Sequence, residues 1–175
     1  LSERVTKAMF PKGGISGGIS NIGYAFSNNE YYAPKMASEL LKEGFFLRVA
    51  GKSFTSLEDN REYTFPAGTI FMPIIGQPAD KEALYERISA LAKQTGVQVH
   101  SFKSAMMKDY DLGSPIYSSL KKPDVAIITG RGLSVSNIGE AWLSIDRRFE
   151  FDHTVIDHSR ITSSRDLSSY NVMVI

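Results

Sequence analysis

A glycine-rich loop with one arginine and two serines is the clearest candidate for chemistry in this sequence. The loop spans residues 130–136, reads Gly-Arg-Gly-Leu-Ser-Val-Ser, and follows an unbroken apolar run over residues 125–128. Where such a buried strand ends and a helix begins, free backbone N–H groups gather and bind anions well. The candidate ligand-binding residues are therefore Gly130, Arg131, Gly132, Ser134 and Ser136.

The loop fits two interpretations. It begins as Gly-x-Gly, but Val135 stands where a dinucleotide-binding fingerprint needs its third glycine. Glycines of a tight turn and serines that cap a helix account for the loop without any ligand. Arg131 and Ser134 could still hold an anion, so both interpretations stay open.

The histidines do not form a catalytic or metal-binding pattern. His100 falls on a predicted strand as a polar strand residue, and His153 and His158 fall at the two ends of another. Zinc bound by the latter two with Asp152 and Asp157 is disfavoured, because strand residues five apart point to opposite faces. The sequence has neither an H-E-x-x-H helix nor a nucleophile–histidine–carboxylate order. It therefore predicts no catalytic residue and no metal site.

Charge and residue content exclude several classes of function. The chain carries 20 Lys+Arg and 19 Asp+Glu, a formal net charge of +1, and the basic residues are scattered. We therefore expect no nucleic-acid partner and no polybasic membrane patch. The absence of cysteine excludes disulfides, thiolate metal sites and a cysteine nucleophile. No apolar run approaches the roughly 20 residues of a membrane span, and the first residues do not form a signal peptide.

The first half of the chain is predicted to contain strands and helices in the order β-α-β-β-α-β. These elements would position the functional side chains of this half. A helix is predicted after Pro34, and a second from Asp80, which can cap it, to Gly96, which can end it. Residues 51–64 read as a polar connection. The strands are predicted at 19–26, 45–50, 65–75 and 97–102.

The second half has a similar alternation of strands and helices, which places the candidate loop between a strand and a helix. Its predicted elements are a strand at 124–129, a helix from about 138 to 149, a strand at 154–157, a turn or short helix at 163–170 and a last strand. We thus expect an α/β protein of two small units with mainly parallel sheets, the second Rossmann-like and cut short. The expected division is a linker at 1–18, an α/β domain at 19–110, a connection at 111–123 and a second α/β domain at 124–175. The first and last residues read as interior to a longer protein.

Several short stretches together resemble a known family. They are Tyr24-Ala-Phe, Asn29-Glu-Tyr-Tyr-Ala-Pro34, Gly68-Thr-Ile, Gln77-Pro78, Val97-Gln-Val-His100, Asp111-Leu-Gly-Ser-Pro115, Pro123-Asp-Val-Ala-Ile and Gly139-Glu-Ala-Trp142. In this order they resemble the region that follows the peptidase domain in large bacterial zinc carboxypeptidase-like proteins of the carboxypeptidase A type. From about Pro123 the chain is similar to the start of a class I glutamine amidotransferase-like domain, a flavodoxin-like fold.

The resemblance implies a non-catalytic accessory region of a secreted or periplasmic bacterial metallocarboxypeptidase. It implies that the zinc ligands lie in an upstream peptidase domain, which would be this region's partner, so we expect no cofactor in this chain and no enzymatic activity. Amidotransferases need a cysteine nucleophile, and the chain has none. The alternative is a module that binds a small molecule or an anion through the loop 130–136.

Overall fold

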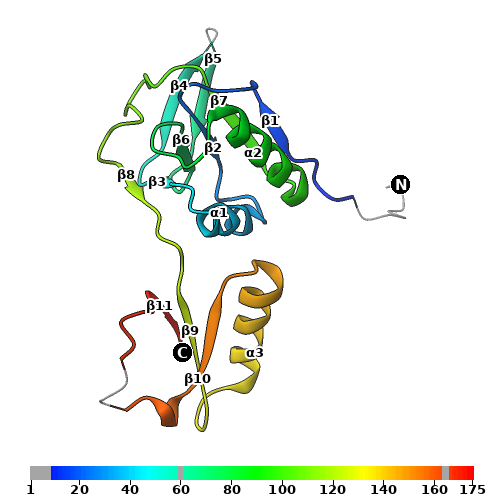
Figure 1. Cartoon of the computed structure of the whole chain (residues 1–175), viewed down its shortest axis with the longest axis vertical. Coiled ribbons are helices and arrows are strands. Elements are labelled where there is room, and N and C mark those ends of the chain that lie inside the picture. The colour runs from blue at the N-terminus through cyan, green and yellow to red at the C-terminus, as the bar shows by residue number, and fades with distance from the viewer. Residues whose placement is uncertain (1–8, 59–60, 163–165) are drawn as a thin grey trace, which may run out of the picture.

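The computed structural model describes residues 9–58, 61–162 and 166–175, which form two α/β units joined by one extended segment (Figure 1). The first unit runs to residue 119, the second begins at residue 125, and the chain passes between them once. The general α/β class predicted from the sequence is confirmed. Among the described residues no helix has the length and apolarity needed to cross a membrane.

The first unit is built on a six-stranded sheet of order β1-β7-β2-β6-β3-β8. Only β1 and β7 run parallel, and the other four pairings are antiparallel. The strands are β1 (Gly14–Ser16), β2 (Gly23–Phe26), β3 (Arg48–Ala50), β6 (Ile70–Pro73), β7 (Gln98–Phe102) and β8 (Tyr117–Ser119).

The prediction of mainly parallel sheets is therefore wrong for this unit. Continuous apolar runs such as the one at residues 70–72 indicate a strand covered on both faces, and parallel strands usually have this property. Here antiparallel strands have it too. Ile70 and Met72 pack into one core, while Phe71 between them packs into another on the opposite face. The pattern reported burial correctly but carried no information on strand direction.

Two helices cover one face of this sheet. Helix α1 (Ala33–Lys42) begins with a proline in its first turn, where the missing N–H costs nothing, and α2 (Lys81–Thr95) begins at Asp80, whose Oδ1 accepts from the N–H of Ala83 at 2.8 Å. Gly96 ends α2 with a φ of 76°, as predicted. The helices bury Met36, Leu40, Leu84, Ile88 and Leu91 against the sheet.

A hairpin that the sequence did not predict covers the other face. Residues 51–64 were expected to be a polar connection, but β4 (Phe54–Glu58) and β5 (Arg61–Phe65) pair antiparallel there. Phe54 is fully buried and stacks on Phe65 with ring centroids 5.0 Å apart. Because β5 has four exposed residues out of five, its sequence reads as loop. Both rings also contact Phe102 of β7, with ring centroids 6.4 Å and 5.3 Å away, and these contacts join the hairpin to the sheet.

The outer strands of the sheet lie in segments that were expected to be irregular. Strand β1 lies within the predicted linker 1–18, of which residues 1–8 fall outside the described ranges, and β8 lies within the predicted connection 111–123. Gly13, just before β1, allows a close approach to α2, since a Cβ at this position would lie 1.8 Å from the carbonyl oxygen of Ala92. Strand β8 pairs with β3 through three residues.

The second unit has a three-stranded parallel sheet of order β10-β9-β11. Its elements are β9 (Val125–Thr129), α3 (Val135–Leu143), the π-helical turn η1 (Ser144–Arg148), β10 (His153–Asp157), the short 3-10 turn η2 (His158–Arg160) and β11 (Val172–Val174). The turn or helix predicted at 163–170 falls partly outside the described residues. Ala126, Ile128 and Ile156 form a small core, and α3 has no fully buried residue. The parallel direction expected for this half is present.

Candidate functional site

The predicted loop lies at the carboxyl edge of the second sheet. Strand β9 ends at Thr129, and Gly130 and Gly132 then turn the chain with φ of 124° and 90°, a region that favours glycine. Ser134 caps α3 by accepting from the N–H of Asn137 at 3.4 Å. The helix therefore begins at Val135, three residues earlier than the sequence suggested.

The carboxyl end of β10 faces this loop. A Cβ added to Gly130 would lie 2.2 Å from His158 Nδ1 and 3.2 Å from Asp157 Oδ1. Asp157 Oδ1 accepts from the N–H of Ser159 at 2.9 Å and from its hydroxyl at 2.6 Å, and these bonds lower the pKa of the Asp157 carboxyl. The edge thus combines a glycine that permits close approach with an imidazole and a carboxylate, two groups that the sequence analysis did not connect to the loop.

The structure divides the five predicted residues into three sets. Gly132 and Ser134 line a hollow of about 290 Å³ between the start of α3 and the end of β11. Gly130 packs toward His158 instead. Arg131 and Ser136 are exposed and do not line that hollow. The five candidate residues of the loop therefore do not converge on one point.

A second polar arrangement, which the sequence analysis missed, lies in the first unit. Ser16 Oγ is 3.4 Å from His100 Nδ1, and His100 Nε2 is 3.1 Å from Glu58 Oε2. The Glu58 side chain is only 6% exposed, and its other oxygen accepts from the N–H of Lys103 at 3.1 Å. The order hydroxyl, imidazole, carboxylate is that of acyl-transfer enzymes.

The surroundings of His100 favour a structural role for these contacts. Its ring lies 5.1 Å from that of Tyr63, 5.3 Å from that of Phe65 and 5.0 Å from that of Phe102. The Ser16 hydroxyl also contacts the carbonyl of Val99 at 3.3 Å. Each contact ties the hairpin or β1 to β7. The three polar residues come from three strands, two of which fell in segments read as irregular, so only pairing of the strands reveals them.

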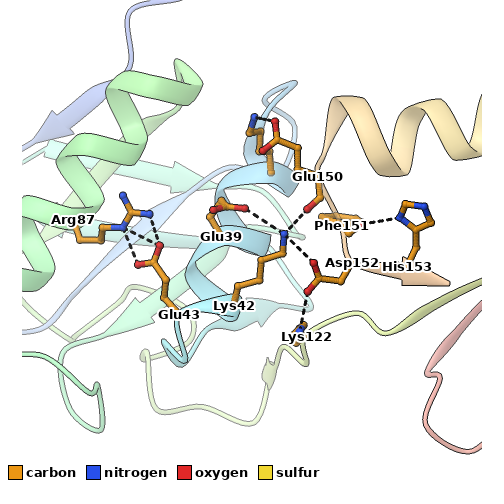
Figure 2. A network of polar contacts seen from close by, with 10 residues as sticks. Glu39, Lys42, Glu43, Arg87, Lys122, Glu150, Phe151, Asp152 and His153 are labelled. Carbon is orange, nitrogen blue, oxygen red and sulfur yellow. Dashed lines mark hydrogen bonds and ion pairs between the residues drawn. The ribbon is translucent and has the colours of Figure 1, made fainter.

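Polar contacts between the units gather around the last residue of α1 (Figure 2). Lys42 Nζ lies 3.4 Å from Asp152 Oδ1, donates to the carbonyl oxygen of Glu150, and lies 3.5 Å from Glu39 Oε1 on its own helix. Lys122, in the segment between the units, approaches Asp152 Oδ2 at 3.0 Å. Lys42 of the first unit therefore contacts the residues that lead into β10 of the second unit.

The ion pairs of Asp152 at the junction are sensitive to acid. Hydrogen bonds from Lys122, and then the charge and hydrogen bond of Lys42, hold the pKa of the Asp152 carboxyl below its ordinary value of 3.8. Because the folded-state pKa is lowered, the stabilisation is present at neutral pH and is lost as the pH falls below that ordinary value. The junction contact should therefore weaken only in acid.

Replacing Lys42 with methionine is expected to loosen the junction without unfolding either unit. Partly exposed ion pairs contribute about 0.2–1 kcal/mol each, so the free energy of unfolding should fall by about 1 kcal/mol or less. Small-angle scattering should show a broader distribution of particle dimensions. Lys108→Met, which breaks an exposed pair with Glu62 on the hairpin, is the matched control. A Lys42 variant with scattering identical to that control would contradict the role of Lys42 at the junction.

Within the described ranges, no group of three or more His, Asp or Glu side chains is arranged to hold a metal ion. Comparison of the chain with protein-family models, with curated proteins and with solved structures gave no match.

Proposed function

We propose that this chain is a non-catalytic accessory region of a bacterial zinc metallocarboxypeptidase of the carboxypeptidase A type, secreted or periplasmic, which supports the peptidase domain or binds its substrate. The proposal begins from the sequence stretches that resemble this class of protein. It is supported by the strand order β10-β9-β11, with all pairs parallel, because a Rossmann-like unit of the flavodoxin or amidotransferase kind begins with this order.

The observation that carries the accessory role is the exposure of several large apolar side chains on the second unit. Parallel sheets are normally buried on both faces. Here Val155 of β10 is 52% exposed on one face of the sheet and Met173 of β11 is 45% exposed on the other, while Trp142 and Leu143 of α3 are 37% and 56% exposed. Apolar side chains gathered on one small unit suit a surface that another domain covers. We take that domain to be the peptidase domain of the same protein.

Two measurements test the accessory role. The chain supplied with zinc should not release the C-terminal residue of a peptide substrate, and measurable turnover would overturn the non-catalytic assignment. In the full-length protein, backbone amides of β10 and β11 should exchange with solvent more slowly than in this chain alone. Equal exchange rates in both proteins would show that no domain covers this surface.

The alternative function is anion binding through the loop 130–136. It is favoured by the position of Gly130 at the carboxyl edge of the sheet, with His158 directly beside it. Arg131 is exposed on the same loop and could close over an anion. Phosphate would then stabilise the native state, because a ligand that binds only the folded protein raises its apparent stability.

Gly130→Ala is expected to disrupt this edge. The side chain would clash with His158 and would demand a φ of 124°, so the second unit should lose about 1–3 kcal/mol of stability and any stabilisation by phosphate. Gly139→Ala is the matched control, because that glycine lies inside α3 with open space around its Cβ position. The control should gain about 0.5–1 kcal/mol. Thermal shift with and without phosphate measures both, and an unaltered phosphate response in Gly130→Ala would exclude the loop as the anion site.

A further inference from the structure

Three cationic side chains from both units converge on one hollow beside the junction. Lys35 of α1 and Arg147 and Arg148 of η1 line a hollow of about 220 Å³. An adjoining hollow, also of about 220 Å³, shares Tyr32 and both arginines with it. The chain as a whole has a formal charge of only +1, so this concentration of positive charge is local.

The charge at this place is only partly neutralised. Lys35 pairs with Glu150 Oε1 at 2.5 Å, and Arg147 Nε lies 3.1 Å from Asp146 Oδ2. In the part of the chain that the structure describes, no carboxylate pairs with Arg148. Its guanidinium instead lies 4.9 Å from the ring centroid of Tyr31. Stacking on a ring leaves the edge N–H groups of a guanidinium available, and a ligand can use them as a bidentate donor.

The backbone that presents the arginines is irregular. Residues 144–148 form a π-helical turn, a rare conformation that is found frequently at functional sites. Glu150, just beyond it, has a φ of 54°, and it is the one non-glycine residue with positive φ among those described. Strained residues of this kind cluster where side chains must be held for a ligand. These two features are independent of the charge and mark the same segment.

Aromatic rings complete the hollow. Phe10 and Tyr32 both line it, with ring centroids 5.7 Å apart. The apolar faces of these rings suit a planar ring of the ligand, whereas Arg147 and Arg148 suit a phosphate or carboxylate with paired oxygens. Each hollow is smaller than the pockets that take drug-sized ligands, so the ligand must be small.

We propose that this basic aromatic hollow binds a small organic anion, an aromatic ring that carries a phosphate or a carboxylate. The anionic group contacts Arg147 and Arg148, and the ring packs on Phe10 and Tyr32. Since the arginines belong to the second unit and the aromatic residues to the first, the ligand bridges the junction beside the Lys42 network. This site is distinct from the loop 130–136 and does not depend on the resemblance to carboxypeptidase-like proteins.

Isothermal titration of the whole chain with four probes tests the proposal. Phenyl phosphate or benzoate should bind with a dissociation constant below about 1 mM, and the tighter of the two identifies the anionic group. Benzyl alcohol, which lacks the charge, and inorganic phosphate, which lacks the ring, should each bind at least tenfold more weakly. Absence of binding by both aromatic anions overturns the proposal. Equal affinity for inorganic phosphate overturns the role of the rings.

Variants locate the binding. The double change Arg147→Gln with Arg148→Gln should weaken the aromatic anion at least tenfold, while Arg61→Gln, an exposed arginine on the hairpin, should have no effect. Both arginines of η1 are exposed, so circular dichroism should show that the double variant keeps its fold. Loss of affinity in Arg131→Gln, with the double variant unaffected, would place the anion on the loop 130–136 and overturn the proposal.

Discussion

Phe102→Ala is expected to lower the free energy of unfolding of the first unit by about 3–5 kcal/mol. Phe102 is fully buried on β7, and its ring centroid lies 5.3 Å from that of Phe65 and 5.9 Å from that of Phe71. Those neighbours belong to the hairpin and to the central sheet. They cannot move into the space left by the lost ring without giving up their own strand positions, so a cavity should remain.

Urea denaturation followed by circular dichroism measures this loss. Phe46→Ala is the matched control, because Phe46 is 39% exposed and should lose well under half as much. A loss of less than about 1 kcal/mol in Phe102→Ala would mean that the hairpin does not close this face of the sheet in solution.

The second large effect is expected from His100→Ala, which leaves the buried carboxylate of Glu58 without its imidazole partner. Glu58 would keep the N–H of Lys103 at 3.1 Å and the Ser56 hydroxyl at 3.3 Å. A buried carboxylate that loses one of its partners costs about 1–3 kcal/mol, and removal of the imidazole from between Tyr63 and Phe65 adds a packing loss. We expect a total of about 2–4 kcal/mol.

A double-mutant cycle separates the two contributions. Glu58→Gln and His100→Gln are made singly and together, and the coupling energy between them reports the direct contact. His153→Gln is the control, because the His153 ring is hydrogen-bonded to the carbonyl oxygen of Phe151, at 3.1 Å, and not to a carboxylate (Figure 2). Additive losses from Glu58→Gln and His100→Gln would show that the pair contributes packing alone and no specific polar interaction.

The sequence predicts those elements whose signals are local. Helix α2 follows from Asp80 at its start, Gly96 at its end and the apolar stripe between them. The loop 130–136 follows from its glycines and the apolar run before it, and its backbone lies at the predicted strand end. In each case the determining residues lie within a few turns of one another, so tertiary contacts refine the boundaries by one to three residues.

What the sequence does not predict depends on which strands pair. The hairpin β4–β5 has an exposed polar surface and is fixed by contacts of Phe54 with Phe65 and Phe102. Strand direction in the first sheet is likewise invisible, since parallel and antiparallel strands buried on both faces have similar composition. The contacts of His100 with Ser16 and with Glu58 join residues up to 84 positions apart in the sequence. Predicting these contacts requires both the hairpin and the direction of the strands in the first sheet.

The placement of β1 and β8 bears on how the first unit can be divided. They are the outermost strands of its sheet, each only three residues long, and they come from opposite ends of this part of the chain. Short outer strands protect a sheet against edge-to-edge aggregation. A truncated chain that follows the boundaries 19–110 suggested by the sequence would lack both. It would expose unpaired edges of β7 and β3, and self-association through those edges would mask the properties of the intact unit.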